Sequence, residues 1–156
     1  MSQFFRVTER NHAAMVLMTE LAARFKSKEW LSLTNLGVSH GISPGYLEEI
    51  VALLKKAGLV KGRAGRTGGY QLAKDPKTIT AHAILTSLEG SLDLLPCLTT
   101  EASCAAAPKC SSRSFWHTMQ KKITHALKQT TLAELSSPRH SAEGPERSRG
   151  ERSPTK

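Results

Sequence analysis

Three cysteines within one short stretch are the residues of this sequence with the clearest capacity for chemistry. Cys97, Cys104 and Cys110 lie in "CLTTEASCAAAPKC", and the 156-residue chain contains no other cysteine. Small residues separate them, and these let the backbone fold closely around an inorganic core. Thiolates are soft ligands that select iron–sulfur clusters, zinc or cuprous copper. The tight Cys-x-x-Cys pairs of structural zinc sites are absent, and three thiolates leave one coordination position open, which suits a sensor.

The fourth ligand and the chemistry itself have alternatives at this point. His12, on the first predicted helix, would serve if it reached the loop of a partner subunit, and His117 is a local competitor seven residues after Cys110. The three thiols are also compatible with a metal-free redox switch, or with reduced cysteines in a surface loop.

The polypeptide carries a strong positive charge. It contains 22 Lys and Arg against 13 Asp and Glu, a formal net charge of +9 at pH 7. Such a surplus favours polyanionic partners such as nucleic acid, through phosphate contacts and counterion release. The first residues lack the apolar run of a signal peptide, and no apolar stretch is long enough to span a bilayer. We therefore expect a cytoplasmic protein without a membrane partner.

A capped helix in the first third of the chain offers side chains suited to DNA. Ser43 is an N-cap residue and Pro44 fits the first helical position. A helix that enters the major groove needs exposed polar side chains at its N-terminal end. The predicted DNA-contacting residues at this end are Ser43, Gly45, Tyr46, Glu48 and Glu49. The hydroxyls of Ser43 and Tyr46 would donate to phosphates, which Gly45 allows to come close. Glu48 or Glu49 would accept from a cytosine amino group.

A β-hairpin that could form a wing is predicted directly after this helix. Two alternating segments, 59–63 and 70–73, flank a turn rich in Gly and Arg. Arg63 and Arg66 have the charge and length to reach the DNA backbone or the minor groove. Helix, short helix, turn, capped helix and hairpin follow the order of a winged helix-turn-helix. We therefore predict a protein that binds double-stranded DNA.

The remaining periodicity predicts a mainly α-helical protein with this small β wing. Helices are expected over 8–24, 31–41, 44–58, 80–88 and 112–127, and the buried stripe of the first is expected to include Phe25. Residues 89–111 have few helix or strand signals. We expect a DNA-binding domain over 1–78, the cysteine loop and a long helix over 79–136, and a disordered tail over 137–156.

Several stretches within residues 6–135 resemble one family of regulators. They are "ISPGYLEEIVALLKKAGLV", "GRTGGYQLAKDPKTIT", the three-cysteine loop and "TTLAEL". They resemble the Rrf-two family of winged-helix iron–sulfur regulators, of the IscR, NsrR and RirA type. The resemblance implies a homodimer that binds palindromic promoter sites, with helix 112–129 packed against its partner. It also implies a [2Fe-2S] or [4Fe-4S] cluster on Cys97, Cys104 and Cys110 that reports iron, redox or nitric oxide status.

The chain departs from this family pattern at its fourth ligand and in its wing. IscR-type members have a histidine three residues after the last cysteine, where this chain has Arg113. NsrR-type members take an acidic ligand from the first helix of the other subunit, and the matching position is His12, with Glu9 nearby. Ala64-Gly65 replaces the usual Arg-Gly of the wing, so Arg63 and Arg66 must supply the wing contact.

The sequence favours a regulator over an enzyme, since it contains no assembled nucleophile, acid–base pair or phosphate loop. Our main hypothesis is a homodimeric, sequence-specific transcriptional regulator that senses through a cysteine-ligated iron–sulfur cluster. The first alternative is a metal-free, thiol-sensing regulator of the same fold. The second is a small metal-binding scaffold protein whose basic surface is incidental.

Overall fold

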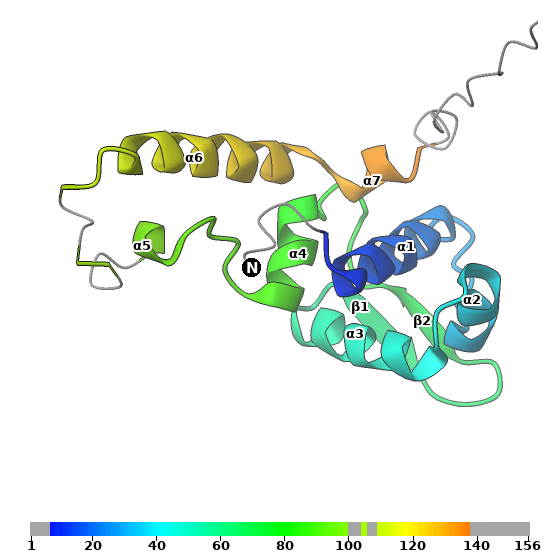
Figure 1. Ribbon diagram of the computed structural model, residues 1–156. Helices are drawn as coiled ribbons and strands as arrows, with labels where there is room; N and C mark the ends of the chain where they lie inside the picture. The colour runs from blue at the N-terminus through cyan, green and yellow to red at the C-terminus, as the bar shows by residue number, and fades with distance from the viewer. Residues whose placement is uncertain (1–6, 100–103, 106–108, 138–156) are drawn as a thin grey trace, which may run out of the picture.

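Helices and one short hairpin make up the described part of the chain. The computed structural model describes residues 7–99, 104–105 and 109–137, so the predicted tail lies outside it from residue 138 on. The elements, in order, are α1 (Glu9–Ala23), α2 (Leu33–His40), α3 (Pro44–Lys56), β1 (Val60–Arg63), β2 (Gly69–Leu72), α4 (Ala81–Glu89), α5 (Pro96–Thr99), α6 (Arg113–Gln129) and α7 (Leu132–Leu135) (Figure 1). The predicted class, mainly α with a small β wing, is confirmed.

Hydroxyl side chains fix where most of these helices begin. Thr8 caps α1, and its oxygen accepts a hydrogen bond from the Asn11 N–H at 3.2 Å. The same arrangement occurs at α2, α3, α4 and α7, whose caps are Ser32, Ser43, Thr80 and Thr131. Such a cap satisfies a backbone N–H that the helix itself leaves without a partner. Helix α2 ends at Gly41 in the left-handed conformation (φ 66°), as the sequence predicts.

The hairpin follows α3, and one residue outside its two strands bridges to it. Strands β1 and β2 pair antiparallel, with Val60 opposite Leu72 and Arg63 opposite Gly69. Leu31 forms an isolated bridge to Tyr70, and each backbone N–H donates to the other residue's carbonyl at 3.0 Å. This bridge attaches the segment before α2 to the wing.

The core lies where α1, α3, α4 and the wing meet. It is entirely apolar among the described residues, and its most enclosed side chains include Leu17, Leu21, Leu47, Ile50 and Leu54. Phe25 is a correction to the predicted stripe. Helix α1 ends at Ala23, so Phe25 leaves the helical spacing, and it is 36% exposed.

The chain returns to this core at its C-terminal end. The Leu132 N–H donates to the Ile79 carbonyl at 2.8 Å, and the Ala81 N–H donates to the Thr130 carbonyl at 2.9 Å. Leu132 has no exposed surface and belongs to the same core as Ile84 of α4. The hydrophobic core therefore contains residues from both sides of the predicted domain boundary at residue 78. The boundary itself stays a prediction.

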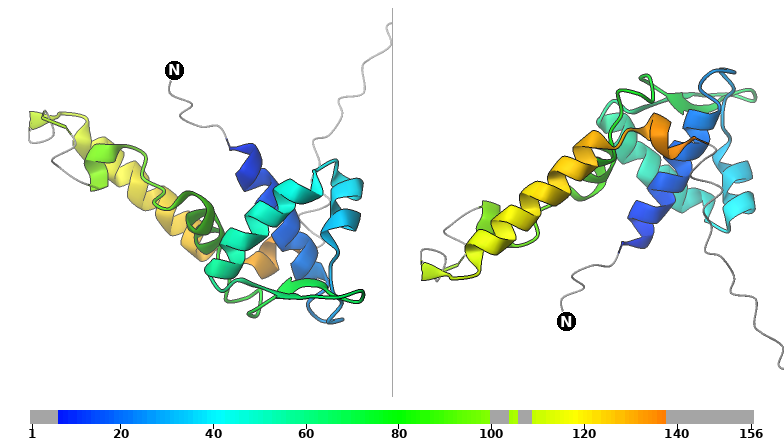
Figure 2. Two further views of the ribbon diagram at one scale, coloured as in Figure 1. Left: turned by 90° about the horizontal axis from the view of Figure 1, so that it is seen from below. Right: turned by 90° about the horizontal axis from the view of Figure 1, so that it is seen from above.

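Helix α6 extends from the core as an arm. Figures 1 and 2 show it projecting away from α1, α2 and α3, with α5 beside its far part. None of its 17 residues is buried, although Phe115, Met119, Ile123 and Leu127 recur every four residues. No helix of the described residues is long and apolar enough to cross a membrane.

Candidate DNA-binding surface and cysteine segment

The N-terminal end of α3 is open to solvent at most of the predicted positions. Ser43, Gly45, Glu48 and Glu49 are exposed, and the space in front of Gly45 is free of other atoms within 4 Å. The Ser43 oxygen accepts a hydrogen bond from the Tyr46 N–H at 3.3 Å, and its own O–H stays available to donate. This end of α3 can therefore approach a phosphate backbone closely.

Tyr46 and Gly37 contribute to the packing of α3 and to the turn between α2 and α3. The Tyr46 ring is half-buried and packs against the core, so only part of it faces solvent. A Cβ at Gly37 would lie 2.4 Å from the Ile42 carbonyl oxygen. Gly37 thus allows the tight turn between α2 and α3, which sets the angle of the helix-turn-helix.

The two wing arginines have different surroundings. The Arg63 guanidinium carbon lies 4.6 Å from the centre of the Trp30 ring, a cation–π contact. Its Nη2 also donates to the Thr67 carbonyl at 2.6 Å. Arg66 is exposed, and among the described residues it has no hydrogen bond or ion pair. Arg63 is therefore suited to shaping the wing and Arg66 to contacting DNA.

The residues just before the first cysteine are attached to the arm helix through one glutamine. Gln120 of α6 accepts a hydrogen bond from the Leu94 N–H at 2.7 Å, and its Nε2 donates to the Leu92 carbonyl at 3.1 Å. The same Nε2 donates to the Thr124 hydroxyl at 3.1 Å, which fixes the amide orientation. Residues 92–94 are thereby held on α6, just before Cys97.

The three thiols differ in environment. Cys97 lies in the short helix α5 and is half-buried, as is Cys104, whereas Cys110 is exposed three residues before α6. The Cys110 sulfur lies 3.3 Å from the Ser112 hydroxyl. Hydrogen bonds from the Ser112 side chain and backbone lower the pKa of the Cys110 thiol, with a smaller contribution from Arg113. Cys110 therefore combines exposure with a lowered pKa, which favours its reaction as a thiolate.

The described residues do not bring a ligand set together within one subunit. No group of three His, Cys, Asp or Glu side chains among them is placed to hold a metal ion. His12, Glu9 and His117 are all exposed. Two views of the ribbon place the N-terminal end of α1 well away from α5, so α1 lies far from Cys97 within one subunit (Figures 1 and 2).

Sequence reasoning missed three parts of this arrangement. It gave Trp30 no role, it treated Gln120 as an ordinary residue of an amphipathic helix, and it predicted no element where α5 lies. The contacts of Trp30 and Gln120 join residues distant in the sequence, so local patterns contain no signal for them. A four-residue helix such as α5 is too short to show periodicity.

The comparisons with known proteins agree with this geometry. Residues 7–138 match the model of the Rrf2 family, which is described as an iron-dependent transcriptional regulator. The chain belongs to the Rrf2 family. It is 32% identical over 130 residues to the HTH-type transcriptional regulators IscR of Yersinia enterocolitica and Serratia proteamaculans, covering 83% of this chain and 78% of each relative.

Solved Rrf2-type structures share its fold. T. potens IscR is 31% identical with a TM-score of 0.70, and the match covers 91% of this chain and 93% of that one. CymR of B. subtilis, described as the global cysteine regulator, is 30% identical with a TM-score of 0.70, over 85% and 96% of the two chains. The prediction of a transcriptional regulator rather than an enzyme is confirmed by these relatives.

Proposed function

We propose that this Rrf2-family protein is a homodimeric, sequence-specific transcriptional regulator of promoter DNA, and that residues 97–110 are its sensor. The family match and the winged helix-turn-helix support DNA binding. The exposed end of α3 and Arg66 are the proposed contacts, with Ser43 and Glu48 or Glu49 facing the major groove. The single observation that carries the sensor is the confinement of every cysteine to residues 97–110, directly after backbone groups that Gln120 holds on α6.

The arm helix supports the homodimer. No residue of this amphipathic helix is fully buried: on its apolar face, Met119, Ile123 and Leu127 are half-buried, and Phe115 is 58% exposed. Such a face gains free energy when a second copy covers it. Dimers that read two half-sites on one side of DNA need recognition helices about 34 Å apart. A dimer built through α6 would fix that spacing, because α6 packs on α4 and α4 on α3.

An iron–sulfur cluster is the proposed sensing group, and its donors are Cys97, Cys104 and Cys110. The donor types suit a [2Fe-2S] or [4Fe-4S] cluster, but the described residues do not converge into a closed site, so binding would require the segment to rearrange. His12 of a second subunit is the proposed fourth ligand, with Glu9 and His117 as competitors. When bound, such a group would add reversible electron transfer and sensitivity to iron supply.

Anaerobic purification with visible spectroscopy and iron and sulfide analysis tests the cluster. We expect a coloured protein that loses iron when Cys104 is replaced by Ala. His12→Ala should shift the spectrum or speed the loss of iron, and His117→Ala should change neither. A colourless, iron-free protein that still binds its promoter would contradict the proposal of a cluster. Normal iron content in the Cys104 variant would show that Cys104 is not a ligand.

A metal-free thiol sensor is the second candidate, and the surroundings of Cys110 favour it. Cys110 is exposed, and its hydrogen bonds to Ser112 lower its pKa, which raises the thiolate fraction near neutral pH. In this candidate, oxidation of the thiols would change how residues 92–94 are held on α6. Purified, iron-free protein should then lose or gain DNA affinity on mild oxidation with hydrogen peroxide and recover on reduction. Unchanged affinity would contradict it.

A further inference from the structure

A cavity at the base of the wing, here called the wing-root cavity, is lined by residues that are neither proposed DNA contacts nor cysteines. It has a volume of about 570 Å³ and lies between the end of α1, the turn after it and both wing strands. No residue of α3 lines it, nor does Arg63 or Arg66. Its size falls in the range of small-molecule sites, about 300–1,000 Å³.

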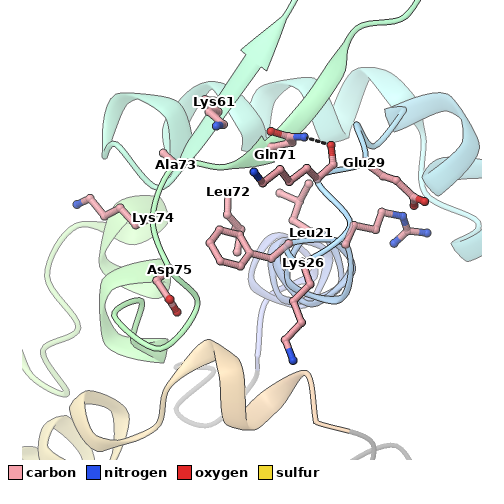
Figure 3. A pocket seen from close by; sticks show the side chains of 12 residues that line it. Leu21, Lys26, Glu29, Lys61, Gln71, Leu72, Ala73, Lys74 and Asp75 are labelled. Carbon is pink, nitrogen blue, oxygen red and sulfur yellow. Dashed lines mark hydrogen bonds between the residues drawn. The ribbon is translucent and has the colours of Figure 1, made fainter.

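The floor of this wing-root cavity is apolar and its rim is basic. Leu21 and Leu72 are buried side chains of the core, and Phe25, 36% exposed, contributes an aromatic ring. Figure 3 shows Leu21 and Leu72 at the centre and Lys26, Lys61 and Lys74 at the rim, with the amino groups of Lys26 and Lys74 directed outward. Phe25 also lines a neighbouring cavity of about 490 Å³, together with Lys26 and Asp75.

Positive charge exceeds negative charge around the cavity. Five basic residues line it, against Glu29 and Asp75; they are Arg24, Lys26, Lys28, Lys61 and Lys74. Arg24 is already paired with Glu20, and Asp75 accepts a hydrogen bond from the Lys77 N–H at 2.8 Å. The four lysines have no ion-pair partner among the described residues. A ligand with a negative group would meet this unbalanced charge.

The wall of the cavity is held in place by a bond between distant segments. Lys28 has a φ of 56°, a left-handed conformation that costs free energy in a residue other than glycine. The Gln71 side-chain amide of β2 donates to the Lys28 carbonyl oxygen, which fixes the turn against the wing (Figure 3). The hollow is therefore formed before any ligand arrives.

From this arrangement we propose that the wing-root cavity binds a small organic anion, a carboxylate, sulfonate or phosphate attached to a flat apolar body. The apolar body lies on Leu21, Phe25 and Leu72, and the anionic group meets Lys61 and Lys74. Because the ligand touches α1 and both strands, it stabilises the base of the wing. Any consequence for DNA affinity rests on the proposed function, whereas binding itself does not.

Fluorescence titration of the full-length protein with 8-anilinonaphthalene-1-sulfonate tests this site. The uncharged N-phenyl-1-naphthylamine, which has the same aromatic body, is the matched probe. We expect the double variant Lys61→Ala/Lys74→Ala to bind the sulfonate about tenfold or more weakly, since it loses two charge-assisted contacts. The uncharged probe should bind equally to both proteins. Lys121→Ala/Lys122→Ala, on the exposed side of α6, is the control and should bind the sulfonate normally.

Two further measurements locate the bound sulfonate and distinguish the cavity from a DNA contact. Amide chemical shifts should change in residues 24–29 and 71–74 when the sulfonate binds, and changes confined to α6 would overturn the proposal. Equal sulfonate affinity in the wild-type protein and the Lys61/Lys74 variant would also overturn it. The salt dependence of DNA binding should be the same in both proteins. A slope lower by about two would assign the lysines to DNA phosphates instead.

Discussion

Arg66 and Arg63 show how two similar side chains acquire different tasks. Arg63 packs on Trp30 and its Nη2 donates to Thr67, so the guanidinium is already engaged inside the protein. Arg66 is exposed and has no such partner among the described residues. The difference arises from the position of Trp30, which lies just before the segment that bridges to the wing.

Arg66→Ala should therefore weaken binding to promoter DNA without changing stability. If Arg66 contacts one phosphate, the slope of log affinity against log salt should fall by about 0.9. The measurement is fluorescence anisotropy with a labelled duplex at several salt concentrations. Lys128→Ala, near the end of α6, is the control and should leave the slope unchanged. If Arg66→Ala had the same salt slope as the wild-type protein, Arg66 would not be a contact to the DNA backbone.

Cys110 should react faster than an ordinary cysteine with iodoacetamide near neutral pH. Its lowered pKa means that more thiolate is present at a given pH, and thiolate is the reactive form. Ser112→Ala removes the largest cause of the shift, so the midpoint of the rate–pH curve should move upward. Ser111→Ala, one residue earlier, should leave it in place. Peptide mass spectrometry of the iron-free protein measures the rate at each cysteine, and identical curves for all three proteins would contradict the assignment.

At the scale of the elements, Gln120 connects the sensor segment to the arm helix. Its amide group holds the Leu92 carbonyl and the Leu94 N–H at the same time. A half-buried side chain that satisfies two backbone groups restricts the segment more than a surface contact would. These two hydrogen bonds of Gln120 therefore restrict the residues that lead into the segment 97–110.

Gln120→Ala should release residues 92–94 from α6. The loss of one hydrogen bond, about 1 kcal/mol, should speed hydrogen exchange of the Leu94 amide about fivefold. Exchange in α3 should stay as in the wild-type protein, since the core is not touched. Gln129→Ala, at the exposed end of the same helix, provides the comparison. Equal Leu94 exchange rates in both variants would show that the clamp does not hold the segment.

The elements also show what local sequence patterns can predict. Helices with a hydroxyl cap and a periodic apolar stripe, such as α3 and α4, were predicted within one or two residues of their ends. The hairpin was predicted from its Gly-rich turn. In contrast, α5, the exposure of Phe25 and the Trp30–Arg63 contact depend on where other segments lie in space. Tertiary packing decides such features, and the local patterns of a single sequence do not predict tertiary packing.

At the scale of the whole molecule, one core connects the winged helix-turn-helix to the arm that carries α5 and Cys97. Leu132 comes from the end of the chain and lies among side chains of the DNA-binding unit. Helix α6 is therefore fixed to the core at its C-terminal end, while its N-terminal end lies beside the cysteine segment (Figure 1). A change at the cysteines can reach the recognition helix through α6 and α4, because α4 packs against both α6 and α3.

The proposed dimer gives the last prediction, and it depends on the apolar stripe of α6, where Phe115 is exposed and Ile123 is half-buried. Ile123 lies on the apolar stripe with Phe115, Met119 and Leu127, and no residue of α6 is buried within one subunit. Ile123→Asp would place a charge in an interface between two copies, at a cost of several kcal/mol. The variant should therefore dissociate while its core stays folded, and it should bind a palindromic site far more weakly.

Size-exclusion chromatography with light scattering distinguishes the outcomes. The wild-type protein should have about twice the chain mass of 17.0 kDa, and Ile123→Asp should have the single-chain mass. Lys122→Asp alters the charge similarly on an exposed neighbouring position and should remain dimeric. If Ile123→Asp kept the dimer mass, a surface other than α6 would have to join the subunits. The coupling from cysteines to paired recognition helices would then require a different route, because α6 is the element that touches both the sensor segment and the core.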